Sequence, residues 1–315
     1  MTKRLAPVMV LLAGCLWGTL GLFARHLTAA GLGSFELTLV RTGGACLACG
    51  LCLLPKPGLF RIRLRDLWCF LGTGIGSMLL FSVFYFLGLP STSLAVATVL
   101  VYTAPSFVML LSLWLFQERL TVKKLVSLGL AFGGCVLVSG LAGGGAAVTA
   151  RGFALCLAAG VFYSLYSIFG KFAVNRGYEP MTLTFYSFFF AALGSAALSD
   201  FRGLGTALAA APDTALWMLG TGVLTAFLPY ALFSTGLRYL EASKASILTT
   251  SELITETLIG SILYREKLTP LMLGGIVLIL AAVLLLNLSP PPPGCAQCRT
   301  DNHMKRRNHT HGQPD

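Results

Sequence analysis

Charged side chains are scarce in this sequence of 315 residues. Asp, Glu, Lys and Arg make up 11% of the chain, whereas a soluble domain carries about 25%. Hydrophobic residues make up 56%, and the mean hydropathy is +0.79. A chain with so few charges cannot solvate the surface of a folded globule, so lipid must cover much of it. The composition excludes an ordinary soluble protein and predicts an integral membrane protein.

Residues that carry enzymatic chemistry are missing from the apolar stretches. The chain has 4 histidines, and none of them lies in an apolar stretch. No His-Glu-x-x-His motif occurs, and the run Gly143-Gly144-Gly145 lacks the Lys-Ser/Thr of a phosphate-binding loop. These absences argue against a membrane-embedded enzyme, and we expect no cofactor.

The 9 cysteines show no disulfide framework. Cys46, Cys49 and Cys52 follow one face of an apolar stretch, where small thiols suit close helix packing better than a metal relay. Cys295 and Cys298 stand near three histidines, but they follow four prolines in a polar tail with no core to fold around. We predict no metal site in the spans, and metal binding by the tail stays open.

Long apolar runs predict transmembrane helices, because a hydrocarbon core about 30 Å thick needs about 20 helical residues to cross it. Ten such runs can be read at 5–24, 34–54, 67–88, 94–116, 125–141, 152–174, 181–199, 215–237, 245–264 and 270–288. None shows the two-residue alternation of a membrane barrel. The sequence therefore predicts an all-α integral membrane protein.

Basic residues are concentrated in alternate loops. With the N-terminus inside, 17 Lys and Arg fall on the cytoplasmic side and 5 on the outer side, while Arg41 lies within a span. This bias predicts a multi-pass protein of the cell membrane with both termini cytoplasmic. The basic residues form no stripe with interleaved aromatics, so the net charge of +11 predicts no nucleic-acid partner.

The chain contains an internal duplication. Glu118-Arg119-Leu120-Thr121 recurs 148 residues later as Glu266-Lys267-Leu268-Thr269, and an offset of 146 aligns Trp17 with Tyr163. Five spans per copy is an odd number, so the second copy must be inverted relative to the first. We predict ten transmembrane helices arranged as two inverted five-helix repeats. Such a duplication is typical of transporters that bind substrate between the copies.

Several motifs resemble the EamA repeat of the drug/metabolite transporter superfamily. They are Ala13-Gly14-Cys15-Leu16-Trp17-Gly18, Arg41, Val101-Tyr102-Thr103-Ala104-Pro105 and the two Glu-basic-Leu-Thr tags. The resemblance covers about residues 5–288. It implies a carrier of small metabolites that often exports amino acids or related compounds. The repeats would span 5–141 and 152–288, followed by a disordered cytoplasmic tail at 289–315.

One position departs from this family. Its members often have Glu-Pro in the ninth span, whereas here Leu253 follows Glu252. A proline removes a backbone hydrogen bond and bends a helix. The sequence therefore puts in doubt a bend in this span, although Pro105 keeps an equivalent feature in the fourth.

Two acids and one base lie within the expected spans. Glu252 and Glu256 are four residues apart and share one helix face. An acid at the bilayer centre costs about 2.5–3.5 kcal/mol, so it normally faces a cavity or a partner. The pair predicts a proton or cation site, with hydrogen bonding to a neighbouring helix as the alternative. Arg41 lies within about 4 Å of the depth of Glu256, so it either pairs, faces a cavity or snorkels to the headgroups.

These patterns predict a secondary transporter that works by alternating access. The substrate path is expected to include Trp17, Arg41, Tyr102, Pro105, Tyr163, Glu252 and Glu256. The expected partners are a small-molecule substrate and the lipid bilayer, with protons as the candidate coupling ion. The alternatives are a channel-like or facilitative permease without ion coupling, and a membrane-embedded enzyme. Substrate identity, direction, coupling ion and assembly as a homodimer stay open.

Overall fold

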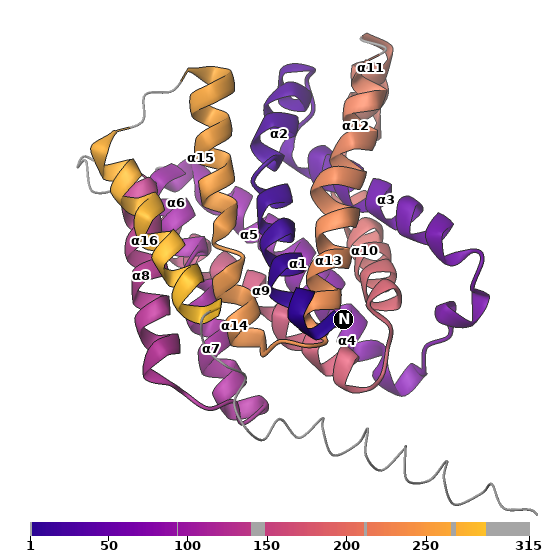
Figure 1. Ribbon diagram of the computed structural model, residues 1–315. Coiled ribbons are helices and arrows are strands. Elements are labelled where there is room, and N and C mark those ends of the chain that lie inside the picture. The colour runs from indigo at the N-terminus through magenta and orange to yellow at the C-terminus, as the bar shows by residue number, and fades with distance from the viewer. Residues whose placement is uncertain (1, 93, 140–148, 211–212, 266–268, 288–315) are drawn as a thin grey trace, which may run out of the picture.

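The computed structural model of the protein describes residues 2–92, 94–139, 149–210, 213–265 and 269–287. All the regular elements in these ranges are helices, as the sequence predicts (Figure 1). The expected tail at 289–315, with its cysteines and histidines, lies outside the described residues, and so does the second Glu-Lys-Leu tag at 266–268.

The helices of the first half follow the apolar runs. In chain order they are α1 (Thr2–Trp17), α2 (Leu20–Ala29), α3 (Ser34–Leu53), η1 (Pro57–Phe60), η2 (Leu64–Asp66), α4 (Leu67–Leu71), η3 (Gly72–Leu79), α5 (Leu80–Gly88), η4 (Leu89–Ser91), α6 (Leu94–Val101), α7 (Ala104–Leu115) and α8 (Val122–Val138).

The second half continues in the same way. Its helices are α9 (Ala150–Asn175), α10 (Pro180–Ala196), α11 (Phe201–Ala210), α12 (Thr214–Gly222), η6 (Val223–Phe227), α13 (Leu228–Leu237), α14 (Ala242–Leu248), α15 (Ser251–Tyr264) and α16 (Pro270–Asn287).

Among the described residues, 6 helical stretches are long and apolar enough to cross a membrane. A seventh is added when α10 and α11, which meet at an angle of 99°, count as one span. The remaining expected spans fall on the shorter helices α8 and α16 and on the interrupted pair α14 and α15. The structure therefore places helices at each expected run, while ten complete crossings remain an expectation.

The expected fourth and ninth spans are both interrupted at matching positions. In the fourth, Tyr102 and Thr103 separate α6 from α7, and in the ninth, Thr249 and Thr250 separate α14 from α15. Pro105 lies in the first turn of α7, where its missing N–H is tolerated. The ninth span is interrupted although it has no proline, so the missing proline does not keep this helix continuous.

A threonine hydroxyl bonds to the preceding turn at each interruption. Thr103 donates to the Leu100 carbonyl at 2.6 Å, and Thr250 donates to the Ile247 carbonyl at 2.7 Å. Side chains that hydrogen-bond to a carbonyl of the preceding turn compete with the helical ladder and bend helices. The same side-chain bond therefore occurs at the end of the first half of each broken span.

The third and eighth spans also share an irregular turn. The residues of η3 and η6 form π-helical turns inside otherwise α-helical spans. With the 148-residue offset, η6 falls within the stretch that corresponds to η3. Extra-residue turns of this kind widen a helix locally and often occur at functional sites.

Helices from the two halves pack directly on one another. The pairs include α1 with α13, α5 with α9, α3 with α10 and α8 with α16. Glycines allow the closest approaches, since a Cβ added to Gly134 would lie 2.7 Å from the Gly275 carbonyl oxygen. Small residues at such contacts are typical of membrane helices, where close packing drives association.

Candidate functional site

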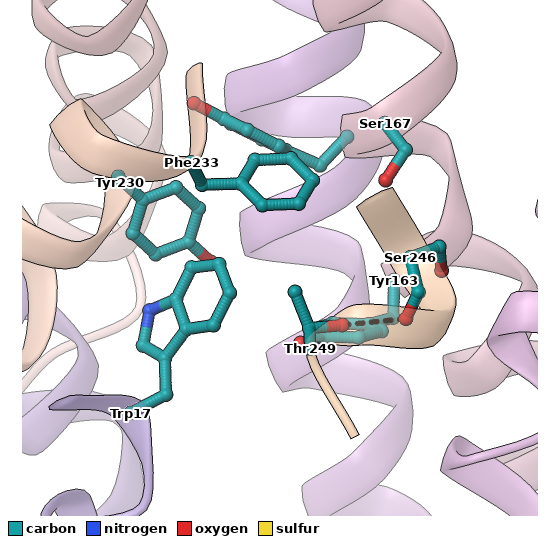
Figure 2. A pocket seen from close by; sticks show the side chains of 8 residues that line it. Trp17, Tyr163, Ser167, Tyr230, Phe233, Ser246 and Thr249 are labelled. Carbon is teal, nitrogen blue, oxygen red and sulfur yellow. Dashed lines mark hydrogen bonds between the residues drawn. The ribbon is translucent and has the colours of Figure 1, made fainter. Parts of the chain in front are cut away.

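A small cavity lies between α1, α9, α13 and α14 (Figure 2). Its lining consists of Trp17, Tyr163, Tyr166, Ser167, Tyr230, Phe233, Ser246 and Thr249. The cavity volume is about 20 Å³, which is room for a water molecule but not for a metabolite. Residues from both halves of the chain thus meet around a small, largely aromatic space.

Trp17 packs against two rings of the aromatic cluster. Its ring centroid is 4.9 Å from that of Tyr230 in an edge-to-face arrangement and 5.6 Å from that of Phe233. Such geometry stabilises aromatic pairs by about 0.5–1.5 kcal/mol beyond area burial. Trp17 is only 5% exposed, and its indole Nε1 has no hydrogen-bond partner.

Arg41 reaches the same cluster from α3. One of its terminal nitrogens donates to the Thr225 carbonyl at 3.3 Å, and the guanidinium also hydrogen-bonds to the Tyr230 hydroxyl. Its Cζ lies 6.0 Å from the Tyr230 ring centroid, and its Nε is buried without a partner. The side chain is thus held against the eighth span.

Glu252 connects the two interrupted spans. It lies in the first turn of α15, where the helix dipole favours a negative charge, and it shares a hydrogen bond with the Tyr102 side chain. Tyr102 occupies the break between α6 and α7. The carboxyl group is also within electrostatic range of Arg41 and Tyr163. The break in one half therefore contacts the acid beside the break in the other.

Glycines of the first span bring α15 close to it. A Cβ on Gly14 would clash with the Ser251 side chain, and a Cβ on Gly18 would lie 2.5 Å from the Glu252 carbonyl oxygen. Only a residue without a side chain allows this approach. The close contact fixes the position of Glu252 relative to Trp17, which precedes Gly18 in the chain.

We expect Gly18→Ala to lower both the unfolding temperature and the transport rate. The added methyl group meets backbone rather than a movable side chain, and such overpacking costs about 1–3 kcal/mol. Gly43→Ala is the matched control, because a Cβ at Gly43 meets nothing within 4 Å. Thermal unfolding of the purified protein measures the effect, and equal unfolding temperatures for the two variants would contradict the close contact.

Two of the expected path residues line the cavity, and the others lie outside its lining. Trp17 and Tyr163 line the same cavity, as their equivalent positions in the duplication suggested. The exposed side chain of Glu256 lies one turn beyond Glu252, and its Oε1 would be 3.8 Å from a Cβ on Gly21.

The expected substrate path does not include six of the lining residues, namely Tyr166, Ser167, Tyr230, Phe233, Ser246 and Thr249. The sequence did contain one signal for Phe233. At the 148-residue offset it falls on Tyr85, so an aromatic residue recurs at this position in both copies.

A second cluster of charges lies where α7, α8 and α14 meet, at the end that the basic residues predict to be cytoplasmic. Glu118 accepts the Ala242 N–H at 2.8 Å and also hydrogen-bonds to the Ser243 hydroxyl. Lys124 lies 3.3 Å from Glu118 and 2.6 Å from Glu241. We call Glu118, Lys124, Glu241 and Ser243 the end cluster. It fastens the start of α14 to the loop after α7.

The end cluster is strongly buried for a charged group. The side chains of Lys124 and Glu118 are 8% and 7% exposed. Lys171 adds a further contact across this end, since its ammonium donates to the carbonyls of Leu237 at 2.8 Å and Leu240 at 2.6 Å. Ser246, one turn from Ser243, lines the aromatic cavity, so the end cluster holds the helix that forms one wall of the cavity.

The described residues include no group of three or more His, Cys, Asp or Glu side chains that could hold a metal ion. Of the three cysteines in α3, Cys49 donates its thiol to the Met181 carbonyl at 3.4 Å, which is a packing contact.

Comparison with known proteins agrees with this architecture. The model of the EamA-like transporter family matches the chain twice, at residues 4–140 and 150–288. The chain belongs to the EamA-like transporter family. It is therefore a two-repeat, all-helical membrane transport protein, and transporters of this kind are generally not enzymes.

The EamA-like relatives carry only general names. An uncharacterized transporter of Archaeoglobus fulgidus is 30% identical over 289 residues, which cover 90% of this chain and 96% of the relative. The uncharacterized transporter YxxF of Bacillus subtilis is 29% identical over 252 residues, 78% of each chain. A solved crystal structure superposes with a TM-score of 0.73 over 89% of this chain and 95% of its own, at 19% identity. That likeness concerns the fold alone.

Proposed function

We propose that the protein is a secondary transporter, acting as an exporter of small metabolites such as amino acids or related compounds. The observation that carries this proposal is the contact between Tyr102 and Glu252 at the two helix breaks, beside an aromatic cavity lined by both halves. Discontinuous helices in corresponding positions of two repeats are the feature by which transporters form a binding site near the bilayer midplane.

In this proposal the two repeats are inverted and contribute ten spans. Transport proceeds by alternating access, as one repeat rocks against the other around the cavity. The end cluster supports a form closed to the cytoplasm, because buried ion pairs join the loop after α7 to the start of α14. The small cavity volume supports a form in which the substrate path is closed around the aromatic side chains.

Protons are the proposed coupling ion, with Glu252 as the group that binds them. An acid within a membrane protein is costly and marks proton or substrate pathways. Glu252 fits this role because it is hydrogen-bonded to Tyr102, lies within range of Arg41 and adjoins a helix break that can move. A facilitative permease would use the same path without protonation of this group.

Transport itself is tested by comparing metabolites released from cells that overexpress the protein with those from cells that lack it. Efflux from vesicles loaded with the enriched compounds then shows whether the protein moves them directly. The rate of transport by a carrier saturates with substrate concentration, and a carrier exchanges substrate across the membrane. Flux through a channel shows neither property. Equal metabolite profiles in both kinds of cell would contradict the proposed function.

The proposed topology predicts the outcome of reporter fusions. A reporter joined after Leu141 should lie outside the cell, and one joined after the last helix should lie in the cytoplasm. The reason is the excess of basic residues, 17 to 5, on the proposed inner side. Activity of an alkaline phosphatase fusion, which requires export, measures each position. A cytoplasmic reporter at the first site or an external C-terminus contradicts the inverted arrangement.

A further inference from the structure

We propose that Arg41, Trp17 and Tyr230 form a subsite that binds a carboxylate group of the transported compound. The inference rests on the proposed transport function and assigns to it a substrate chemistry and the residues that select it. The three residues come from different spans, since Trp17 ends α1, Arg41 lies in α3 and Tyr230 in α13.

Two unused hydrogen-bond donors belong to neighbours of Tyr230. The indole Nε1 of Trp17 and the Nε of Arg41 are both buried, and neither has a hydrogen-bond partner. Trp17 packs against the Tyr230 ring at 4.9 Å, and Arg41 hydrogen-bonds to the Tyr230 hydroxyl. Buried polar groups in folded proteins are nearly always paired, so two unpaired donors around one residue need an explanation.

The chemistry of these donors selects the ligand. Arginine and indole N–H groups only donate hydrogen bonds, and a guanidinium binds carboxylates with two parallel bonds. Trp17 and Tyr230 line the cavity, and Figure 2 shows the indole standing beside the Tyr230 ring. An oxyanion beside Tyr230 would meet the positive charge of Arg41 and the neutral donors of Trp17 and Tyr230. An ammonium group would be repelled by the same charge.

Arg41 is not already neutralised by a direct ion pair. In the described part of the chain its side chain contacts the Thr225 carbonyl and Tyr230, and no salt bridge joins it to a carboxylate. Glu252 lies within electrostatic range of Arg41, but it shares its hydrogen bond with Tyr102. Glu252 thus balances the positive charge of Arg41 at a distance, and the Nε–H of Arg41 stays available to a ligand.

Four probes with the same branched alkyl chain test the subsite: leucine, isocaproate, leucinamide and isoamylamine. Each is added at equal concentration to the purified full-length protein, and binding is measured as the rise in unfolding temperature across a titration. We expect leucine and isocaproate to bind and the two compounds without a carboxylate to bind at least about tenfold more weakly.

Variants assign the effect to the residues. Arg41→Gln should weaken leucine binding by about tenfold or more and Trp17→Phe by about threefold, because they remove a charged and a neutral donor. Arg41→Lys keeps the buried charge without the planar donor set, so it gives an intermediate loss even where the glutamine variant does not fold. Arg151→Gln and Trp217→Phe are matched controls away from the cavity, and they should leave binding unchanged.

Several results would overturn the subsite. They are equal binding of leucinamide and leucine, stronger binding of isoamylamine, and the absence of binding by all four probes to the unaltered protein. In the last case the two donors bind water only. Metabolite efflux from overexpressing cells tests the transport function separately. Efflux that persists without any preference for carboxylates therefore refutes the subsite and leaves the proposed function standing.

Discussion

Replacement of Glu252 by glutamine is expected to lower the rate of transport by at least about tenfold and to remove its dependence on a pH gradient. Glutamine has the same shape and can keep a hydrogen bond to Tyr102, but it can neither bind a proton nor carry a charge. The substitution therefore separates the chemistry of the carboxyl group from its packing. Efflux from proteoliposomes, measured with and without an imposed pH gradient, gives both quantities.

Two further variants sharpen this test. Glu256→Gln changes an exposed acid one turn away on the same helix, and we expect a smaller loss of transport. Tyr102→Phe removes the hydroxyl that contacts Glu252 and should shift the pH dependence without abolishing transport. Normal pH dependence in both glutamine variants would restrict the two acids to a structural role. Loss in Glu256→Gln alone would place the proton site nearer the outer end of α15.

Removal of the Glu118 carboxylate is expected to open the proposed cytoplasmic end. Glu118→Ala leaves the Ala242 N–H and the Ser243 hydroxyl without their acceptor and deprives Lys124 of one of its two carboxylates. Charged hydrogen bonds contribute about 1.5–3 kcal/mol each, so the closed form should become about tenfold less populated or more. We expect the start of α14 to become accessible to water from the cytoplasmic side.

Thiol labelling measures this opening. A cysteine in place of Ser246, which lines the cavity, should react faster with a water-soluble maleimide in inside-out vesicles when Glu118→Ala is also present. Glu179→Gln is the matched control, because its ion pair with Arg238 is at the same end but 45% and 39% exposed, where pairs contribute little. Similar labelling rates in the two backgrounds would mean that the end cluster does not keep the path closed.

The duplication allowed part of the site to be predicted. Trp17 and Tyr163 were selected because they occupy matching positions in two copies, and the structure places both on one cavity. Equivalent positions of two copies lie at equal distances from a symmetry axis, so if one of them lies near the axis, the other does too. Tyr230 had no such support, since its partner at the 148-residue offset is Ser82. Its role depends on Trp17 and Arg41, which come more than 180 residues earlier in the chain. The contact between Arg41 and Thr225, for example, joins residues that are 184 positions apart.

The position of Arg41 shows another limit of sequence reasoning. Depth in the bilayer can be counted from the rise per residue, and it suggested Glu256 or the headgroups as partners. The contacts to Thr225 and Tyr230 depend instead on which helices are neighbours around the axis. The sequence gives the depth of a residue in the bilayer, but it does not give the position of its helix around the bundle or which helices are neighbours.

The break in the ninth span was uncertain for a different reason. Proline is not needed at a helix interruption. At the two interruptions Thr250 bonds to the Ile247 carbonyl and Thr103 bonds to the Leu100 carbonyl. Threonine is common inside membrane spans, so its presence does not by itself mark a break. At the 148-residue offset the two interruptions agree to within one residue, and only this recurrence distinguishes these threonines from the others.

The paired π-helical turns, η3 and η6, bear on the history of the chain. A π turn contains one residue more than the α-helical turn it replaces, and an extra residue rotates everything that follows by about 100°. Such a change is costly in a packed helix and is hard to acquire twice at the same place. Because both copies carry the irregularity at corresponding positions, a single ancestral insertion, older than the duplication itself, accounts for both. The ancestral repeat would then have had this irregular helix before it was joined to a second copy of itself.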